Sequence, residues 1–290
     1  MNKLTALVCK SIFAIALIFG TSQYAFSSPT ATITLTSAVG TNAQTKCIGT
    51  AITNITYSTG GGATGASITG LPTGINGVWA ANVFTISGTP SVSGSFSYTV
   101  STIGGGAVVT ATGTITVNAF PTVSITGTNA VCIGSTTTLS PTTGGTWLSN
   151  NTAVATVTNA GVVTGVSNIN PANATFRFTN TATGCTSQPT SLVTVNPLPP
   201  AFIVGSNSIC VNGITQLLPS PPGPSVLYTW VSSNPAIATV SNTAGFTSGL
   251  VTGVYPGIVT FTSTFTSSGC SATTLPISVN PIPQILFINS

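Results

Sequence analysis

The sequence contains one unit repeated three times, and this repetition constrains the fold more than any other feature. Each copy begins with a proline-containing segment that leads into a short strand-like run and then a cysteine, at Cys47, Cys132 and Cys210. Each copy closes with an alternating run that ends in Val-Asn, at Asn118, Asn196 and Asn280. Proline follows within three residues each time, and it fixes φ and cannot donate a ladder hydrogen bond. These segments therefore predict stiff linkers between separate folding units.

The pattern inside each unit favours a small antiparallel β-sandwich, because short runs of period two recur over about 80 residues. The chain is rich in threonine, valine and isoleucine, which favour strands, and its 31 glycines and 19 prolines supply turns. With 42% hydrophobic residues it is too apolar to be disordered. We predict an all-β chain with domains at residues 28–119, 120–197 and 198–281, followed by a segment at 282–290.

Charged side chains are almost absent, and the missing types exclude several functions. Asp, Glu and His do not occur, and four of the 290 residues are charged: Lys3, Lys10, Lys46 and Arg177. Without carboxylates or imidazoles there is no general acid or base, no Ser-His-Asp triad and no carboxylate cation site. Zinc would depend on unsuitably spaced cysteines, and phosphate binding needs many cations. We expect no enzyme, no metal or other cofactor, no nucleic-acid partner, and a surface of hydroxyls and amides.

Residues 1–27 predict a cleaved secretory signal. A basic start precedes an apolar run over Leu4–Gly20, which Lys10 interrupts, and Ala25-Phe26-Ser27 is a small-x-small cleavage motif. The alternative is a membrane anchor, but the uninterrupted apolar stretch is about ten residues, half of what a spanning helix needs. We expect cleavage after Ser27 and a mature chain that leaves the cytoplasm without a membrane span.

The second and third repeats also share their interiors. TWLSNNTAVATVTNAGVVTGVS in one matches TWVSSNPAIATVSNTAGFTSGLVTGVY in the other. Over residues 121–283 the chain resembles bacterial Ig-like domains of group 2. Over residues 70–100 the stretch GLPTGINGVWAANVFTISGTPSVSGSFSYTV resembles a related Ig-like subtype. The resemblance implies three tandem Ig-like sandwiches of a secreted bacterial surface protein, where such domains act as spacers or binding modules.

Each repeat carries one tryptophan, at Trp79, Trp147 and Trp230. Each stands beside a predicted strand, at what we expect to be the same place in its repeat. We predict one core aromatic residue per sandwich. The alternative is a set of exposed rings on which sugars of a surface glycan stack.

Removal of the signal leaves five cysteines. Cys132 and Cys185 lie in the second repeat, Cys210 and Cys270 in the third, and the second cysteine of each pair ends an equivalent TATGC or SSGC turn. Because an exported chain meets oxidising conditions, we predict one disulfide within each of these two domains. Cys47 is then left over, since glycines replace the second cysteine in the first repeat. It is either a buried or capped thiol or an intermolecular link between subunits.

The C-terminal segment resembles the opening strand of a fourth repeat. Its apolar residues are Ile285, Leu286, Phe287 and Ile288. A lone strand of this kind is not stable in water. Two explanations remain open: the chain is a fragment of a longer array, or the strand is donated to a neighbouring copy, which would build a head-to-tail filament.

Two functions follow from these features. The first is a non-enzymatic extracellular structural protein, a rod of Ig-like domains that assembles with copies of itself on a bacterial surface. The alternative is an adhesin or carbohydrate-binding spacer module from a larger cell-surface protein. Self-assembly suits a chain with almost no charge repulsion, and it should be indifferent to pH between 4 and 8, salt and chelators.

Overall fold

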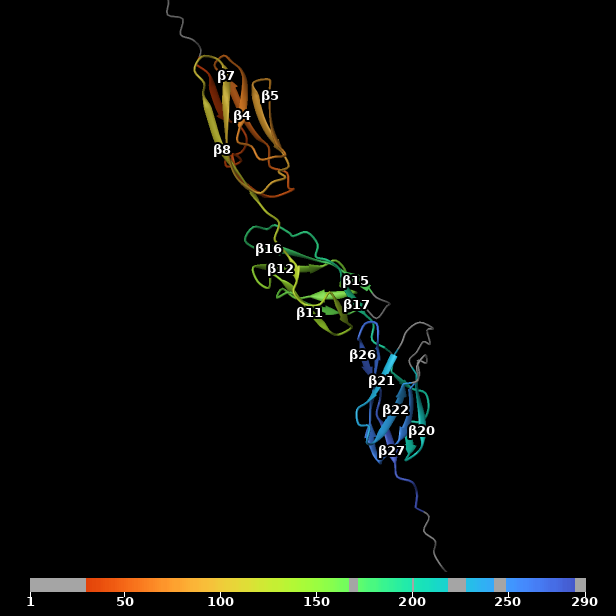
Figure 1. The fold of residues 1–290 in the computed structure, drawn as a ribbon. Helices are drawn as coiled ribbons and strands as arrows, with labels where there is room; N and C mark the ends of the chain where they lie inside the picture. The colour runs from red at the N-terminus through yellow and green to blue at the C-terminus, as the bar shows by residue number, and fades with distance from the viewer. Residues whose placement is uncertain (1–29, 167–171, 200, 219–227, 243–248, 285–290) are drawn as a thin grey trace, which may run out of the picture. The chain divides into compact units, whose positions relative to one another are not determined.

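The computed structural model describes residues 30–166, 172–199, 201–218, 228–242 and 249–284. Every regular element in these ranges is a β-strand, which confirms the predicted all-β class (Figure 1). No helix in the described part is long and apolar enough to cross a membrane. The predicted signal and the candidate donor strand Ile285–Ile288 lie outside the described residues.

The first module, defined here as the strands up to and including Asn118, has two four-stranded sheets in the orders β1-β3-β6-β5 and β2-β8-β7-β4. Its strands are β1 (Thr32–Leu35), β2 (Ala43–Cys47), β3 (Ile55–Gly60), β4 (Ala63–Thr69), β5 (Ile75–Ala80), β6 (Val83–Gly88), β7 (Gly94–Gly104) and β8 (Thr110–Asn118). Read as strands A, A′, B, C, D, E, F and G, these sheets are A-B-E-D and A′-G-F-C. This is the strand arrangement of an immunoglobulin sandwich.

The second module repeats this order with a divided F strand. One sheet is β13-β14-β11-β9, and the other consists of β10-β17-β15 and β12-β16. The strands are β9 (Ser124–Ile125), β10 (Ala130–Cys132), β11 (Thr136–Ser140), β12 (Gly145–Ser149), β13 (Ala155–Val157), β14 (Val162–Gly165), β15 (Ala172–Ala174), β16 (Phe176–Asn180) and β17 (Val193–Asn196).

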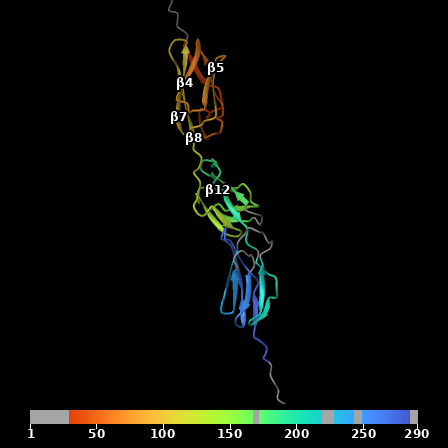
Figure 2. The ribbon, with the colours of Figure 1, turned by 45° about the vertical axis from the view of Figure 1, so that its right-hand side comes forward.

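The third module, coloured teal to blue in Figure 2, is built in the same way. Its sheets are β18-β20-β23-β22, β19-β27-β24 and β21-β25-β26. Its strands are β18 (Phe202–Ile203), β19 (Ser208–Cys210), β20 (Ile214–Leu218), β21 (Tyr228–Ser232), β22 (Ala238–Asn242), β23 (Gly249–Gly253), β24 (Gly257–Val259), β25 (Phe261–Phe265), β26 (Ser271–Thr273) and β27 (Ile277–Asn280). The prediction of tandem Ig-like sandwiches is therefore confirmed.

Period-two sequences build the three cores. In β3 the residues Ile55 and Tyr57 are buried while their neighbours are only half-buried, as alternation across a pleat requires. Separate clusters of buried apolar residues form around Tyr57, around Trp147 and around Trp230. The chain divides into two compact units after Asn118, and the second unit holds the second and third modules.

Hydroxyl groups cover the outer faces of the sheets. Thr136, Thr164 and Thr156 are direct cross-strand neighbours in one row across β11, β14 and β13. Where two such side chains approach, they bond to each other, as the hydroxyls of Thr126 and Thr138 do at 2.8 Å. Side chains without charge thus cover the pleated surface, as the composition predicts.

The motif shared by the second and third repeats folds into one hydrogen-bonded turn after strand C. Ser149 donates to the carbonyl of Ala155 at 2.7 Å, and Ser232 donates to Ala238 at the same distance. The side chains of Asn151 and Asn234 each accept from the backbone N–H two residues on, at 3.1 Å. The Ser-x-Asn spacing in TWLSNN and TWVSSN is therefore a structural requirement of this turn.

Candidate functional site

The three cysteines that open the repeats, called strand cysteines here, have the same backbone setting. Cys47, Cys132 and Cys210 each end strand A′ and lie opposite the final asparagine of the parallel strand G. The N–H of the following residue donates to that asparagine's carbonyl at 2.9–3.1 Å, for example from Ile133 to Asn196. Each strand cysteine therefore lies at the exit end of its module, where the chain leaves for the next linker.

A tight turn fixes each strand cysteine. Its carbonyl accepts from the N–H three residues on, at 3.0 Å in the first module, 2.9 Å in the second and 2.8 Å in the third. The residue two after the cysteine has a positive φ, 76° at Gly49, 77° at Gly134 and 66° at Asn212. Glycine and asparagine are the residues that tolerate this conformation at the third position of a turn. The Cys-Ile-Gly and Cys-Val-Asn segments are thus equivalent.

The other two described cysteines, called turn cysteines here, also share one setting. Cys185 and Cys270 end the turn after strand F, and their carbonyls accept from Asn180 and Phe265 at 3.0 and 2.9 Å. The preceding glycine has φ near 70° in both turns. Both cysteines are fully buried. Since strand G starts from this turn, the turn cysteines lie at the opposite end of the module from the strand cysteines.

This placement separates the two cysteines of one module. After Cys185 the chain runs beside strand F, with Ser187 and Thr190 donating to Phe178 and Phe176, before strand G ends at Asn196. About ten residues of extended chain cover roughly 30 Å. A disulfide needs Cα atoms within about 7 Å. Cys132 therefore cannot bond Cys185, and the same reasoning separates Cys210 from Cys270.

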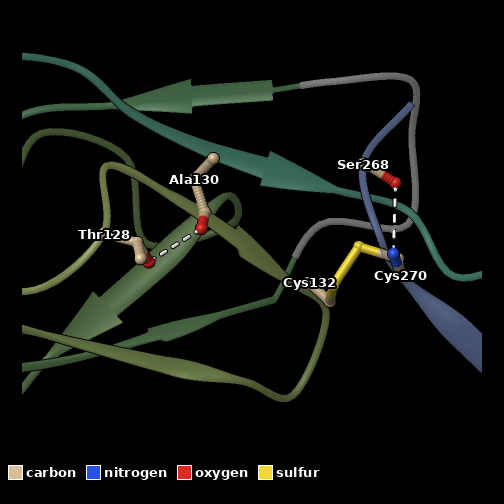
Figure 3. Close-up of a disulfide and its surroundings, with 5 residues drawn as sticks. All are labelled: Thr128, Ala130, Cys132, Ser268 and Cys270. Atoms are coloured by element: carbon tan, nitrogen blue, oxygen red, sulfur yellow. Dashed lines mark hydrogen bonds between the residues drawn. A yellow bond between two sulfur atoms is a disulfide. The ribbon is translucent and has the colours of Figure 1, made fainter. Parts of the chain in front are cut away.

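The structure instead joins Cys132 of the second module to Cys270 of the third, with Cα atoms 5.6 Å apart (Figure 3). Thr128 and Ser268 support the two ends: the Thr128 hydroxyl donates to Ala130 at 2.9 Å, and the Ser268 hydroxyl accepts from the Cys270 N–H at 3.3 Å. The predicted pairs Cys132–Cys185 and Cys210–Cys270 are therefore wrong. The disulfide links two modules and closes neither.

The expected fate of the leftover cysteine is also wrong. Cys47 is disulfide-bonded, as is Cys185. Among the cysteines in the described ranges, the free thiol is Cys210, and it is exposed. The sequence did carry a signal for the correct pairing. In each repeat the strand cysteine and the closing Val-Asn end two neighbouring parallel strands, which places the cysteine at the end of the module where the chain leaves it. Sequence reasoning paired cysteines within a repeat and did not ask at which end of the sandwich each one lies.

The tryptophans do not form one equivalent set. Trp147 and Trp230, on strand C, are 6% and 2% exposed, and Trp147 Nε1 donates to the Pro141 carbonyl at 2.9 Å. Trp79 lies on strand D of the other sheet, packs against the first core and donates to the Thr59 hydroxyl at 2.9 Å. The expectation of one shared position is wrong for Trp79. Buried rings at Trp147 and Trp230 offer no face to a sugar.

The third module has a hollow of about 500 Å³ next to an exposed aromatic ring. Phe202, 54% exposed, lines it together with Asn207, Thr274 and Leu275. Sequence reasoning missed Phe202, because it sought glycan platforms among the tryptophans. The ring and the amide are the groups present there that could contact a neutral ligand.

The electrostatics of the described residues are weak. Arg177 donates through Nη1 to the carbonyl of Ser187 at 2.9 Å, because the sequence contains no carboxylate side chain to pair with it. In the first core, burial and the 3.0 Å hydrogen bond with Tyr57 raise the pKa of Tyr98 far above its ordinary value. No cluster of three or more metal-ligating side chains occurs among the described residues.

Comparisons with known proteins leave the family open. No family model matches the sequence, and no curated protein matches it. Solved structures similar to the chain include an I-band fragment of titin, with 11% identity, 83% of this chain and 96% of that chain covered, and a TM-score of 0.34. An ectodomain fragment of ICAM-5 has 8% identity, coverage of 87% and 77%, and a TM-score of 0.33. An endo-fucoidan hydrolase has 14% identity, coverage of 83% and 43%, and a TM-score of 0.22. These scores are too low to bear on function, so the Ig-like assignment rests on the strand order.

Proposed function

We propose that the chain is a non-enzymatic extracellular structural protein whose Ig-like modules are joined in series by disulfides. The observation that carries this proposal is the Cys132–Cys270 bond, which connects the second module to the third. Structural disulfides persist in oxidising compartments outside the cytoplasm. The resemblance of residues 121–283 to bacterial group 2 Ig-like domains supports a place on a bacterial surface.

The disulfide adds a second covalent connection at one junction. The backbone already joins the two modules through Pro197–Pro199. A second connection, between the exit end of one module and the F–G turn of the next, limits how far the two can separate when the chain is pulled. It also holds the junction together if the linker backbone is cut. Both effects suit a spacer that must keep its length under tension and resist extracellular proteases.

Disulfide mapping and limited proteolysis test this proposal. Non-reduced peptides of the secreted protein should contain Cys132 linked to Cys270, and a Cys132–Cys185 peptide would contradict the proposal. After cleavage in the linker near Pro199, the two halves should stay together without reductant and separate with it. In Cys132→Ser they should separate in both conditions. Cys210→Ser is the matched control, since it removes an exposed thiol and leaves this bond intact.

Filament assembly by strand donation stays a prediction, because Ile285–Ile288 lie outside the described residues. A donated opening strand would have to take the place beside strand B. In each module that place is filled by the module's own strand, β1 beside β3, β9 beside β11 and β18 beside β20. A copy could accept a strand only by releasing its own. If deletion of residues 284–290 leaves polymerisation of the secreted protein unchanged, strand donation is excluded.

A glycan-binding spacer is the second candidate, and the hollow beside Phe202 is the observation that favours it. A neutral sugar stacked on this ring would leave its hydroxyls near Asn207 and Thr274. Glycan-array binding that is lost in Phe202→Ala and kept in Phe120→Ala, another exposed ring, would support this function. An array without signal would reject it.

A further inference from the structure

We propose that Cys210 forms a further disulfide with the turn cysteine of another Ig-like module, which lies next to the exit end of the third module. This inference rests on the proposed serial linkage and extends it beyond the described chain. The partner is defined by its chemistry: a sandwich with a cysteine at the end of its F–G turn, in the setting of Cys270.

The first argument is the equivalence of Cys210 and Cys132. Both end strand A′ opposite the last residue of strand G, in the same parallel register. In both, the N–H of the residue after the cysteine donates to the carbonyl of the asparagine that ends strand G. The carbonyl of the cysteine accepts from the N–H of the residue three positions on, at 2.9 Å for Cys132 and 2.8 Å for Cys210. A polar brace precedes each: Thr128 donates to the carbonyl of Ala130 and Ser206 to that of Ser208. In this setting Cys132 is bonded to the next module.

The second argument is the exposure of the third module's exit end. Cys210 and Asn280 are exposed, whereas their counterparts Cys132 and Asn196 are half-buried. Pro283, in the linker that leaves the third module, is exposed, whereas Pro199 in the preceding linker is buried. The exit ends of the second and third modules have the same strand register and backbone hydrogen bonds, and the residues at the exit end of the third module are accessible.

A second copy of this chain does not offer the required cysteine. Its Cys185 and Cys270 are buried and already disulfide-bonded. Its first module has Gly104 at the end of strand F, and Gly105 and Gly106 in the loop to strand G. The partner is therefore a different module with a free turn cysteine, either later in the same polypeptide or in another protein. A symmetric Cys210–Cys210 dimer is the competing outcome.

The reaction is an ordinary two-thiol oxidation. The Cys210 and partner thiols lose two protons and two electrons and form one S–S bond, and a disulfide oxidant of the glutathione disulfide or thiol-oxidoreductase class is reduced to two thiols. Cys132–Cys270 is left as it is.

The test uses the full chain and an extended version in which residues 198–284 are repeated once after Gln284. Both are folded with glutathione disulfide, alkylated without reduction and mapped by mass spectrometry. In the original chain, Cys210 should be alkylated. In the extended chain the original Cys210 should be linked to the copy of Cys270, and alkylation should move to the copy of Cys210.

Two matched extensions keep the result interpretable. Repeating residues 120–197 supplies a different module with a turn cysteine and should also link Cys210, so misfolding of one extension does not decide the outcome. Repeating residues 30–118 supplies a module without a turn cysteine and should leave Cys210 alkylated. Cys210 that stays alkylated beside folded modules with turn cysteines, or that forms only a Cys210–Cys210 dimer, overturns the inference. Absence of Cys132–Cys270 from the same maps would instead overturn the proposed function.

Discussion

The second and third modules share strand order, cysteine settings and the turn after strand C, yet they differ in three places. Cys132 is oxidised, while Cys210 is an exposed thiol. Trp147 lies opposite Phe178, with ring centroids 5.2 Å apart, while Trp230 lies opposite Ser263. Thr137 donates to the carbonyl of Thr128 at 2.7 Å, while the buried hydroxyl of Thr215 has no partner among the described residues. The third module therefore keeps the frame and lacks several of the interactions that stabilise the second.

The difference shows which parts of the repeat define the fold and which only stabilise it. The A′–G register is the same in all three modules, and the Ser-x-Asn turn is the same in the second and third, so both belong to the frame that these two modules share. The Trp–Phe contact is not needed, because the third module forms the same sheets with a buried Ser263 whose hydroxyl has no partner in the described part of the chain.

Loss of the inter-module disulfide should have the largest effect. The bond closes a sequence separation of 138 residues. On the chain-entropy model, removing it in Cys132→Ser lowers the combined free energy of unfolding of the two modules by about 5 kcal/mol. Urea unfolding without reductant measures this. Cys210→Ser should leave the midpoint unchanged, and equal midpoints for both variants would show that the disulfide contributes nothing.

Making the second core resemble the third should have the next largest effect. Phe178→Ser removes the ring that faces Trp147 and leaves a cavity with a polar group, which costs about 3–5 kcal/mol by comparison with Phe→Ala changes. Hydrogen exchange should show lost protection in β12 and β16 only. Thr179→Ser, at the neighbouring half-buried position, is the control and should change little. Unchanged protection after Phe178→Ser would mean that this ring is not part of the stabilising core.

Two threonine-to-valine substitutions, one in each module, should differ in their effect on the free energy of unfolding. Thr137→Val breaks a part-buried hydrogen bond to the Thr128 carbonyl, so it should destabilise the second module by about 1 kcal/mol. Thr215→Val removes a buried hydroxyl without a described partner and keeps the shape, so it should be neutral or stabilise the third module by about 1 kcal/mol. Urea midpoints of the two variants give the comparison. Equal losses at both positions would show that Thr215 is satisfied in solution.

The smallest effect should be a pH dependence that the third module shows and the second module lacks. Burial raises the pKa of Tyr228. The unfolded chain then releases this proton near pH 10 while the folded module keeps it, so stability is constant below pH 10 and falls above it. Residues 120–197 contain no tyrosine. Variants that keep only Trp147 or only Trp230 report the two modules separately, and Tyr228→Phe should abolish the difference. A parallel decline in both modules would refute this assignment.

The sequence was sufficient for the fold because repetition and alternation act locally. Period-two runs around Ile55 and Tyr57 bury one face, and the prolines after Asn118 and Asn196 mark where strands cannot continue. These signals lie within a few residues of one another, so they can be read without knowing the packing.

The cysteine pairing could not be read in the same way, because it depends on which ends of neighbouring sandwiches meet. Cys132 is 53 positions from Cys185 in the numbering but at the other end of the module, and it bonds Cys270, 138 positions away. Likewise, Phe178 and Ser263 occupy one structural position that the differing loop lengths of the two repeats obscure. Register and strand direction decide these contacts, and neither is a property of a short segment.

Because Cys132 lies at the exit end of its module, the Cys132–Cys270 disulfide belongs to the junction between the second and third modules and not to either module alone. A gene rearrangement that removed one whole module would bring together a strand cysteine and a turn cysteine from modules that were not neighbours, and the equivalent settings would let them bond. A rearrangement with its break inside a module would leave a cysteine without a disulfide partner on each side of the break. Loss or gain of whole modules thus leaves the cysteines at each junction able to pair, so an array of this design can change its length without losing its cross-links.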